Sequence, residues 1–314
     1  MNHLQHITIA DYVTQNGDKV EPLNLSYQCF GLQLLTAPIV LVNHALTGNS
    51  NVAGTDGWWN ELVGDDKVID TKKYTVLAFN IPGNGYDGFV IDNYKAFVAR
   101  DIAKLFLLGL EKLRISNLYA IIGGSLGGGI AWEMAVLNPS LATHLIPVAT
   151  DWKSTDWLMA NCQIQEQFLV NSNNPVHDAR MHAMLCYRTP ESFKHRFHRS
   201  KNEELQLFNV ESWLLHHGKK LQERFQLSAY KLMNQLLRTI DVTKGRTEQI
   251  LDRIQSKITI VAVDSDLFFT AEENRETQKQ LALTNPNVTY SEIHSIHGHD
   301  AFLIEYEQLE KIIE

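Results

Sequence analysis

Residues 118–130 read Leu-Tyr-Ala-Ile-Ile-Gly-Gly-Ser-Leu-Gly-Gly-Gly-Ile, and this stretch decides the fold. An apolar, β-branched run leads into Gly123-Gly124-Ser125-Leu126-Gly127, which matches the pattern G-x-S-x-G. The pattern is typical of a nucleophile elbow, in which a serine occupies a strained turn between a strand and a helix. The sequence therefore predicts a strand over Leu118–Ile122, a helix from about Leu126 to Leu137, and a reactive Ser125.

This glycine-rich stretch has two other interpretations. A tight turn that packs a helix onto a sheet needs the same small residues, and a phosphate-binding loop has a similar composition. A Walker loop, however, ends in Gly-Lys-Ser or Gly-Lys-Thr, and no such ending follows Gly127. A serine nucleophile is the favoured interpretation.

The composition is that of an ordinary globular protein and argues against several kinds of partner. Of 314 residues, 44% are hydrophobic and 20% charged, with a net charge of −8 and a pI near 5.9. An acidic chain argues against electrostatic binding to nucleic acid or to an anionic membrane. The N-terminus lacks signal-peptide features, no apolar run has the length of a membrane span, and the three cysteines show no C-x-x-C spacing. We expect a cytoplasmic protein without a metal site.

Short apolar runs alternate with helical patterns in the first half of the chain. The expected strands cover Pro38–Val42 and Tyr74–Phe79, a further strand ends near Ala149, and a helical pattern runs from Tyr94 to Leu113. This alternation predicts an α/β fold with a mostly parallel sheet and helices on both faces.

A helical segment interrupts the alternation from residue 151 to about residue 252, where strand-like runs are almost absent. The later expected elements are strands over Ile258–Val263 and Val288–Ile293, a helix over Glu272–Ala282 and a final helix from about Ala301. We expect residues 1–150 and 253–314 to form one α/β core. Residues 151–252 are expected to form a helical lid over the carboxyl ends of the strands, where open α/β sheets bind ligands.

A reactive serine needs a base that accepts its proton and an acid that orients the base. In enzymes with this elbow the chain order is serine, acid, histidine, and each partner lies in a loop after a strand. The strand over residues 258–263 leads into Asp264 and Asp266, and spacing does not choose between them.

Three histidines, His294, His297 and His299, follow the next expected strand and supply the base. The same trio has the spacing H-x-x-H-x-H, which also occurs in metal sites. No partner motif with carboxylates or cysteines appears elsewhere in the chain, so catalysis is favoured over metal binding.

Two backbone N–H groups are expected to stabilise the oxyanion of the reaction. One belongs to Leu126, directly after the serine, and the other to the loop after the first expected strand. That loop is Asn43–Gly48, and its expected donor is chiefly the N–H of Leu46. His44 is better suited to shaping the turn than to proton transfer.

Several motifs together resemble the homoserine O-acyltransferases, a family with the α/β-hydrolase fold. The motifs are His44–Gly48 with Gly57–Gly64 and Ile69–Tyr74, the elbow Gly123–Gly128, Ala179-Arg180-Met181 with Tyr187-Arg188, Val210 to Phe225, Ser228–Tyr230 with Asp241-Val242, Ser265-Asp266, and Gly298–Leu303. The resemblance covers most of the chain from about Pro38 to Leu303. It implies an α/β-hydrolase fold and selects Asp266 and His299 as the partners of Ser125.

The resemblance also implies the substrates. Arg180 binds the carboxylate of an amino-acid acceptor, Tyr187 lies beside it, and Asp300 receives the α-amino group. A planar guanidinium matches a carboxylate, and an acid beside the catalytic histidine can hold an ammonium group. The implied reaction moves an acetyl group from acetyl-CoA to the hydroxyl of homoserine through an acyl-serine, as a step of methionine biosynthesis. No permanently bound cofactor is expected, and the expected assembly is a homodimer formed through the lid.

One segment departs from the family's pattern. After Asn80 the family usually has a longer Gly-Gly-Cys-x-Gly-Ser/Thr-Thr-Gly-Pro stretch, whereas this chain has Ile81–Gly88. That loop borders the entrance of the active site in the family. Succinyl-CoA as donor, serine as acceptor, and water as acceptor in a serine esterase or thioesterase therefore stay open. A catalytically silent binding protein is disfavoured, because binding does not require a complete set of serine, acid and base.

Overall fold

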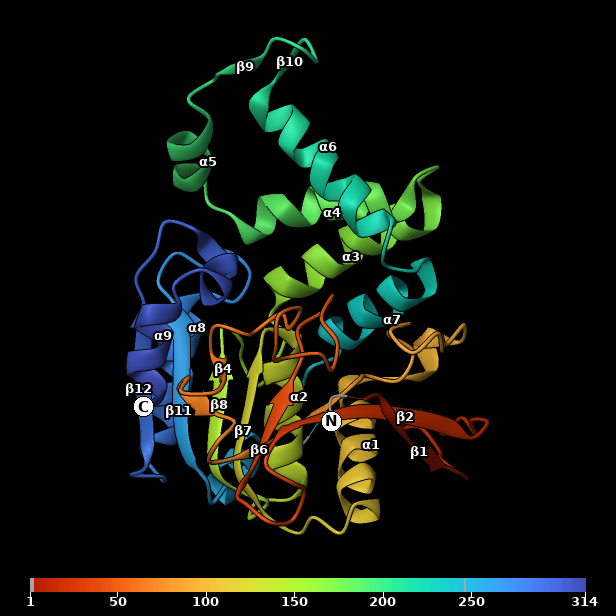
Figure 1. Ribbon diagram of the computed structural model, residues 1–314, viewed down its shortest axis with the longest axis vertical. Helices are drawn as coiled ribbons and strands as arrows, with labels where there is room; N and C mark the ends of the chain where they lie inside the picture. Colours follow the sequence, from red (N-terminus) through yellow and green to blue (C-terminus); the bar gives the residue numbers. More distant parts are fainter. Residues whose placement is uncertain (1–2, 246) are drawn as a thin grey trace.

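The computed structural model describes residues 3–245 and 247–314 and is built on one sheet of eight strands (Figure 1). In their order across the sheet, the strands are β1 (Gln5–Ile9), β2 (Leu23–Gly31), β6 (Thr75–Phe79), β3 (Ile39–Asn43), β7 (Leu118–Gly124), β8 (Ala142–Val148), β11 (Lys257–Val263) and β12 (Val288–Ile293). The strands from β6 to β12 are parallel, whereas β1 and β2 are antiparallel. The predicted α/β fold with a mostly parallel sheet is confirmed.

The helices follow the strands in the expected alternation. They are α1 (Ala99–Lys112), α2 (Leu126–Leu137), α3 (Asp156–Asn171), α4 (Pro175–Tyr187), α5 (Pro190–Phe197), α6 (Asn209–Gln222), α7 (Leu227–Arg238), α8 (Ala271–Leu281) and α9 (Tyr306–Ile313). Short 3₁₀ turns are η1 (Tyr94–Ala96), η2 (Glu248–Arg253) and η3 (Gly298–Leu303). The single helix expected from Tyr94 to Leu113 is divided between η1 and α1, and the final helix expected from Ala301 is divided between η3 and α9.

The sheet is covered on both faces because its central strands are apolar on both sides. Leu41 of β3 packs in one hydrophobic core with α1 and α2, whereas Val40 and Val42 pack in a second core with α9 and residues 52–69. Alternate side chains of a strand point to opposite faces, so a continuous apolar run such as β3 needs a layer on each side. Among the described residues, no helix combines the length and the apolar character needed to cross a membrane.

The first two strands of the sheet, β1 at its edge and β2 next to it, were not expected from the sequence. β2 contains Ser26 and Gln28, which read as loop residues but are buried. Ser26 Oγ accepts a hydrogen bond from Asn80 Nδ2 at 2.9 Å, and Gln28 Oε1 accepts one from Ser50 Oγ at 2.7 Å. These hydrogen bonds offset the cost of burying polar groups, so a polar strand can lie inside the fold.

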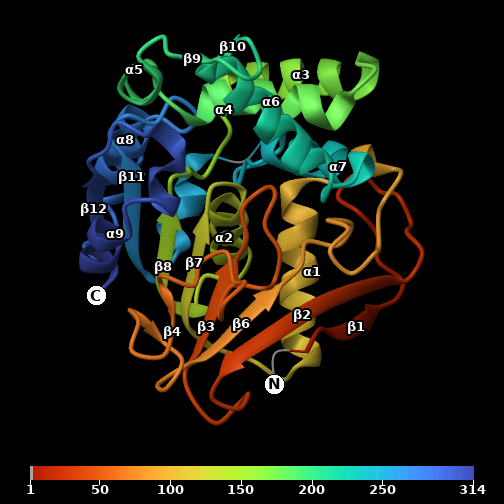
Figure 2. The ribbon, with the colours of Figure 1, turned by 45° about the horizontal axis from the view of Figure 1, so that its top comes forward.

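The expected lid, residues 151–252, forms five helices, α3 to α7, that lie together beyond the carboxyl ends of the strands (Figures 1 and 2). Two strand pairs of two residues each were not expected: β4 (Val63–Gly64) with β5 (Ile69–Asp70) in the core, and β9 (Lys201–Asn202) with β10 (Leu207–Phe208) at the far end of the lid.

A short antiparallel neck joins the lid to the core. The N–H of Ser154 donates to the carbonyl of Ile240 at 2.8 Å, and the N–H of Val242 donates to the carbonyl of Trp152 at 3.2 Å. The helical insertion therefore leaves and re-enters the core at adjacent points. The last residues assigned to the lid from sequence include most of η2, whose Ile250 and Leu251 pack in the core shared with α1 and α2.

A buried ion pair ties together α1 and α2. Arg100 Nε lies 2.7 Å from Glu133 Oε2, both side chains are at most 5% exposed, and Arg100 Nη2 also donates to the carbonyl of Val242. Burial raises the pKa of Glu133 to about 7, although Arg100 opposes this shift. The pair thus links both helices to the neck of the lid.

We expect Glu133→Gln to lower the free energy of unfolding by about 3–5 kcal/mol, because Arg100 then remains charged and buried without a counter-charge. Arg100→Met should cost less, since Glu133 can take up a proton whereas an arginine cannot lose one. Urea denaturation measures both differences. Lys219→Ala, in an exposed pair with Glu223 at 3.9 Å, is the control and should change stability by less than about 1 kcal/mol. Equal and small effects of all three substitutions would contradict this account.

Candidate active site

Ser125 occupies the turn between β7 and α2 with a backbone φ of 55° and ψ of −124°. Residues other than glycine rarely adopt a positive φ. The turn brings β7 and α2 very close: a Cβ on Gly123 would lie 2.4 Å from the carbonyl carbon of Gly127, and a Cβ on Gly127 would lie 2.3 Å from the carbonyl oxygen of Asn43. The glycines of the motif are therefore required for this close approach, which leaves Ser125 at the carboxyl end of the sheet.

Ser125, His299 and Asp266 form a continuous hydrogen-bonded chain. His299 Nε2 lies 2.9 Å from Ser125 Oγ, and His299 Nδ1 lies 2.7 Å from Asp266 Oδ2. Because an ionised carboxylate only accepts hydrogen bonds, Nδ1 carries the proton and Nε2 is free to accept one from Ser125. All three residues are at least 95% buried. The arrangement can pass a proton from the serine hydroxyl to the histidine.

The backbone after β11 orients Asp266. Its Oδ1 accepts hydrogen bonds from the N–H groups of Phe268 at 2.6 Å and Phe269 at 3.0 Å, while Oδ2 faces His299. Asp264, the alternative acid, instead lies 3.0 Å from His294, whose side chain is exposed. The structure thus joins Asp266, and not Asp264, to the serine.

The three histidines that the sequence left as candidates have different partners. His294 pairs with Asp264, His297 Nδ1 lies 3.0 Å from Ser192 Oγ, and His299 joins the buried chain. Their rings do not converge on one point.

Aromatic rings surround His299. Its ring centroid lies 5.1 Å from that of Phe268, 5.4 Å from that of Tyr187 and 5.6 Å from that of Phe302. Tyr187 comes from the lid, and the other rings come from the core. Such an enclosure limits the access of water to the histidine and to the serine beside it.

The two expected oxyanion donors belong to buried residues, Leu126 directly after Ser125 and Leu46 in the loop after β3. Leu46 is 6% exposed and Leu126 is fully buried. Among the described residues, no protein acceptor receives a backbone hydrogen bond from either N–H. A buried N–H without an internal partner is rare, and two such groups can serve a developing negative charge.

His44 shapes the loop that carries Leu46. Its Nδ1 lies 2.8 Å from the carbonyl oxygen of Ala45, and its Nε2 accepts a hydrogen bond from the N–H of Ile81 at 3.0 Å. Burial lowers the pKa of His44 to about 4, so the ring is neutral near pH 7. The role expected from the sequence, a turn-shaping histidine, agrees with these contacts.

The segment after Asn80 packs tightly against the same loop. Asn80 Oδ1 accepts hydrogen bonds from the N–H of Ser50 at 2.8 Å and from Asn84 Nδ2 at 3.1 Å. Asn80 and Asn84 are both buried. The segment Ile81–Gly88, which departs from the family's pattern, thus packs next to the loop that carries Leu46.

The residues expected to bind substrate meet around Tyr187. The guanidinium carbon of Arg180 lies 5.6 Å from the centre of the Tyr187 ring. Burial raises the pKa of Tyr187 well above its usual value, and the nearby charges of Arg180 and Asp300 act on it in opposite directions. Asp300 is also paired within the protein, because its Oδ2 lies 2.9 Å from Arg188 Nε. The sequence motifs assign no role to Arg188, although it follows Tyr187 in one of them.

A small enclosed cavity lies between the lid and the active-site loops. Leu46, Tyr187 and Phe268 line it on the side of the triad. The lid helices supply the rest of the lining, which includes four buried polar side chains, Asn161, Gln165, Tyr230 and Asn234, together with Cys162, Ala183, Cys186 and Leu237. Tyr230 and Gln165 are hydrogen-bonded to each other at 3.2 Å. The lid therefore contributes both polar and apolar side chains to this cavity.

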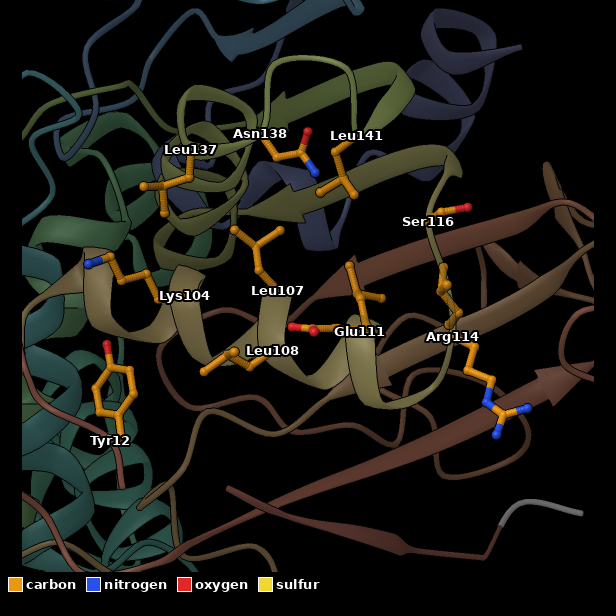
Figure 3. A pocket seen from close by; sticks show the side chains of 12 residues that line it. Tyr12, Lys104, Leu107, Leu108, Glu111, Arg114, Ser116, Leu137, Asn138 and Leu141 are labelled. Carbon is orange, nitrogen blue, oxygen red and sulfur yellow. The ribbon is translucent and has the colours of Figure 1, made fainter. Parts of the chain in front are cut away.

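A larger hollow of about 740 Å³ lies at the opposite end of the sheet and does not include the triad (Figure 3). Leu107 points from α1 toward Leu137 and Leu141, and Lys104 and Glu111 lie on the same helix. Because Leu141 directly precedes β8, this hollow belongs to the amino ends of the strands.

Comparisons with known proteins agree with the geometry. A sequence model of the alpha/beta hydrolase fold matches residues 38–305. A protein of Cyclobacterium marinum described as homoserine O-acetyltransferase is 32% identical to this chain, and the match covers 95% of the chain and 90% of that protein. The chain belongs to the homoserine O-acetyltransferase family of α/β-hydrolases. The resemblance stated from the sequence motifs is confirmed.

Other similar proteins and structures fit this family assignment. A homoserine O-acetyltransferase of Chloroherpeton thalassium is 33% identical, over 87% of this chain and 78% of that protein. The crystal structure of the Staphylococcus aureus homoserine O-acetyltransferase has a TM-score of 0.81 at 24% identity, and it matches 100% of this chain and 94% of that one. The crystal structure of esterase E22 has a TM-score of 0.87 at 19% identity. At these identities the structures support the fold alone.

The neutral His44 leads to a pH-dependent prediction. The folded chain keeps the pKa of this ring near 4, whereas an unfolded chain restores it to about 6.5. Between these values the unfolded state binds the additional proton, so the stability contributed by His44 is present above about pH 6.5 and is lost as the pH falls toward 4. His44→Asn should be less stable near neutral pH but should show a shallower loss of stability on acidification. Urea denaturation across this window measures both slopes, and equal slopes would contradict a buried neutral His44.

Proposed function

We propose that the chain transfers an acetyl group from acetyl-CoA to the hydroxyl of L-homoserine. The observation that carries the proposal is the position of Tyr187, whose ring lies beside His299 and beneath the Arg180 guanidinium. The Tyr187 ring thus contacts both the catalytic histidine and a guanidinium that can bind a carboxylate. The names of the relatives supply the acetyl group and homoserine.

The first half of the proposed reaction makes an acetyl-serine. His299 Nε2 accepts the proton of Ser125 Oγ, and the oxygen attacks the thioester carbonyl of acetyl-CoA. The N–H groups of Leu46 and Leu126 stabilise the oxyanion, and Asp266 stabilises the imidazolium. The C–S bond then breaks, and CoA leaves as a thiol with the proton from His299.

The second half transfers the acetyl group to the acceptor. Arg180 binds the carboxylate of homoserine, Asp300 binds its ammonium group, and Tyr187 packs between these charges. His299 removes the proton of the homoserine hydroxyl, whose oxygen attacks the acetyl-serine, and the proton returns to Ser125 as O-acetylhomoserine leaves. The same base serves both halves because the second mirrors the first. The aromatic enclosure of His299 favours this acceptor over water.

We further propose that two copies of the chain associate through the lid and act in the cytoplasm. Apolar side chains that are about half exposed gather on α3 and α4: Trp157, Ile164, Val170 and Leu185. Exposed apolar residues on neighbouring helices favour a protein interface. The cytoplasmic location rests on three free cysteines, which suit a reducing compartment.

The decisive test mixes the purified protein with acetyl-CoA, with and without homoserine, and follows free thiol and O-acetylhomoserine. We expect an ester product and thiol release that depends on homoserine. Thiol release without homoserine and without ester would identify a hydrolase. Replacing acetyl-CoA by succinyl-CoA, or homoserine by serine, tests the remaining donors and acceptors.

Ser125→Ala should abolish the acetyl-enzyme and lower turnover by roughly 10⁴-fold or more, because the acyl carrier is lost. Intact-protein mass spectrometry detects the acetyl group, and the melting temperature reports whether the fold survives. Ser116→Ala is the matched control, since Ser116 is exposed at the opposite end of the sheet. Wild-type turnover by the Ser125→Ala protein would overturn the mechanism.

Arg180→Gln should raise the KM for homoserine by about tenfold or more, because the charge-assisted hydrogen bonds to the carboxylate are lost. Formation of the acetyl-enzyme does not use this carboxylate, so its rate should change far less. Pre-steady-state thiol release measures the first half-reaction, and initial rates at varied homoserine concentration measure the second. Equal losses in both half-reactions would contradict the role of Arg180 in binding the carboxylate of homoserine.

A further inference from the structure

The segment between α4 and α5 is hydrogen-bonded to the loop that carries His299. Thr189 Oγ1 donates a hydrogen bond to the carbonyl of Ile296 at 2.5 Å, and Ser192 Oγ lies 3.0 Å from His297 Nδ1. Between them the backbone approaches closely, since a Cβ on Gly298 would lie 2.9 Å from the carbonyl oxygen of Tyr187. This part of the lid is therefore docked on the core at a fixed position.

The strongest contact of this docked segment is an ion pair. Arg188 Nε lies 2.9 Å from Asp300 Oδ2, and each side chain is 17% exposed. A charge-assisted hydrogen bond between two groups that are largely shielded from water is stronger than an exposed ion pair. Asp300 Oδ1 has no protein hydrogen-bond partner among the described residues. One oxygen of this carboxylate is thus held, and the other is left for a ligand.

Arg180, the cation proposed to bind the carboxylate of the acceptor, lies over the ring of Tyr187. Asp300 directly follows His299, whose ring centroid lies 5.4 Å from that of Tyr187. Within the described part of the chain, Arg180 forms no ion pair with a carboxylate. The carboxylate of Asp300, in contrast, is held by Arg188. This ion pair fixes the side chain of Asp300 next to the catalytic histidine.

We infer that Arg188 is a positioning residue that fixes the carboxylate of Asp300 beside His299 and leaves its other oxygen for the ammonium group of the acceptor. The inference rests on the proposed function and deepens it. The site then offers two opposite charges, Arg180 and Asp300, one for each charged group of an α-amino acid. Arg188 does not touch the substrate; it selects acceptors with an ammonium group through the position of Asp300.

The distinction between the two arginines can be measured with two acceptors. Homoserine carries both charged groups, whereas γ-hydroxybutyrate is homoserine without its amino group. Removing Arg188 should weaken only the acceptor that has an ammonium group. Removing Arg180 should weaken both acceptors, because both have the carboxylate.

The experiment compares Arg188→Gln, Arg188→Lys and the wild type. We expect Arg188→Gln to raise the KM for homoserine by about tenfold, with a change of less than about threefold in the KM for γ-hydroxybutyrate. Arg188→Lys should recover part of the loss, because its ammonium retains the charge. Arg196→Gln is the matched control, since Arg196 is an exposed lid arginine on α5 that lies over Phe197 and Trp213. It should leave both KM values unchanged.

Two results would overturn the inference. In the first, Arg188→Gln leaves the KM for homoserine unchanged. In the second, it raises both KM values equally, which would mean that Arg188 only docks the lid. Calorimetric titration with homoserine separates this inference from the proposed function, because binding does not require turnover. If the wild type binds homoserine but transfers no acetyl group, the proposed function fails, and weaker binding by Arg188→Gln still supports the inference. If the wild type does not bind homoserine, both fail.

Discussion

The strained turn at Ser125 is the constraint on which the active site depends. A positive φ at a serine costs about 1–3 kcal/mol, and it persists only where the surrounding structure leaves no alternative. Here β7, α2 and the loop after β3 approach so closely that Gly123 and Gly127 have no space for a Cβ. The same turn buries Leu126 at the first position of α2 and directs the serine hydroxyl toward His299. The nucleophile and the expected oxyanion donor Leu126 are therefore arranged by a single backbone feature.

In the proposed reaction, in contrast, recognition of the acceptor is divided between two parts of the chain. The lid supplies Arg180, Tyr187 and Arg188, while the core supplies Asp300 next to His299. The two parts meet at an ion pair and at the ring of Tyr187. Formation of the acyl-serine can thus be retained when the lid changes. The choice of acceptor, in contrast, requires that the lid and the core are correctly positioned relative to each other. This division fits a fold on which esterases and acyltransferases are both found.

The sequence predicts what is encoded locally and misses what depends on distant partners. The elbow and the order of serine, acid and histidine could be predicted because each follows an apolar strand. Spacing could not choose Asp266, which is distinguished by burial and by two backbone donors. Strand β2 was missed because Ser26 and Gln28 look like loop residues until their partners are known. The ion pair of Arg188 was also not accessible, since its partner Asp300 lies 112 positions away in the sequence.

The antiparallel neck between residues 152–154 and 240–242 has a consequence for how such enzymes diversify. Because the two connections are adjacent, an insertion of any length can be accommodated there with little change in the entropy of closing the loop. The strands on either side, β8 and β11, pair directly with each other whatever lies between them in the chain. The helical segment is therefore an exchangeable module, and replacing it as a unit offers a route to new acceptors without rebuilding the catalytic core.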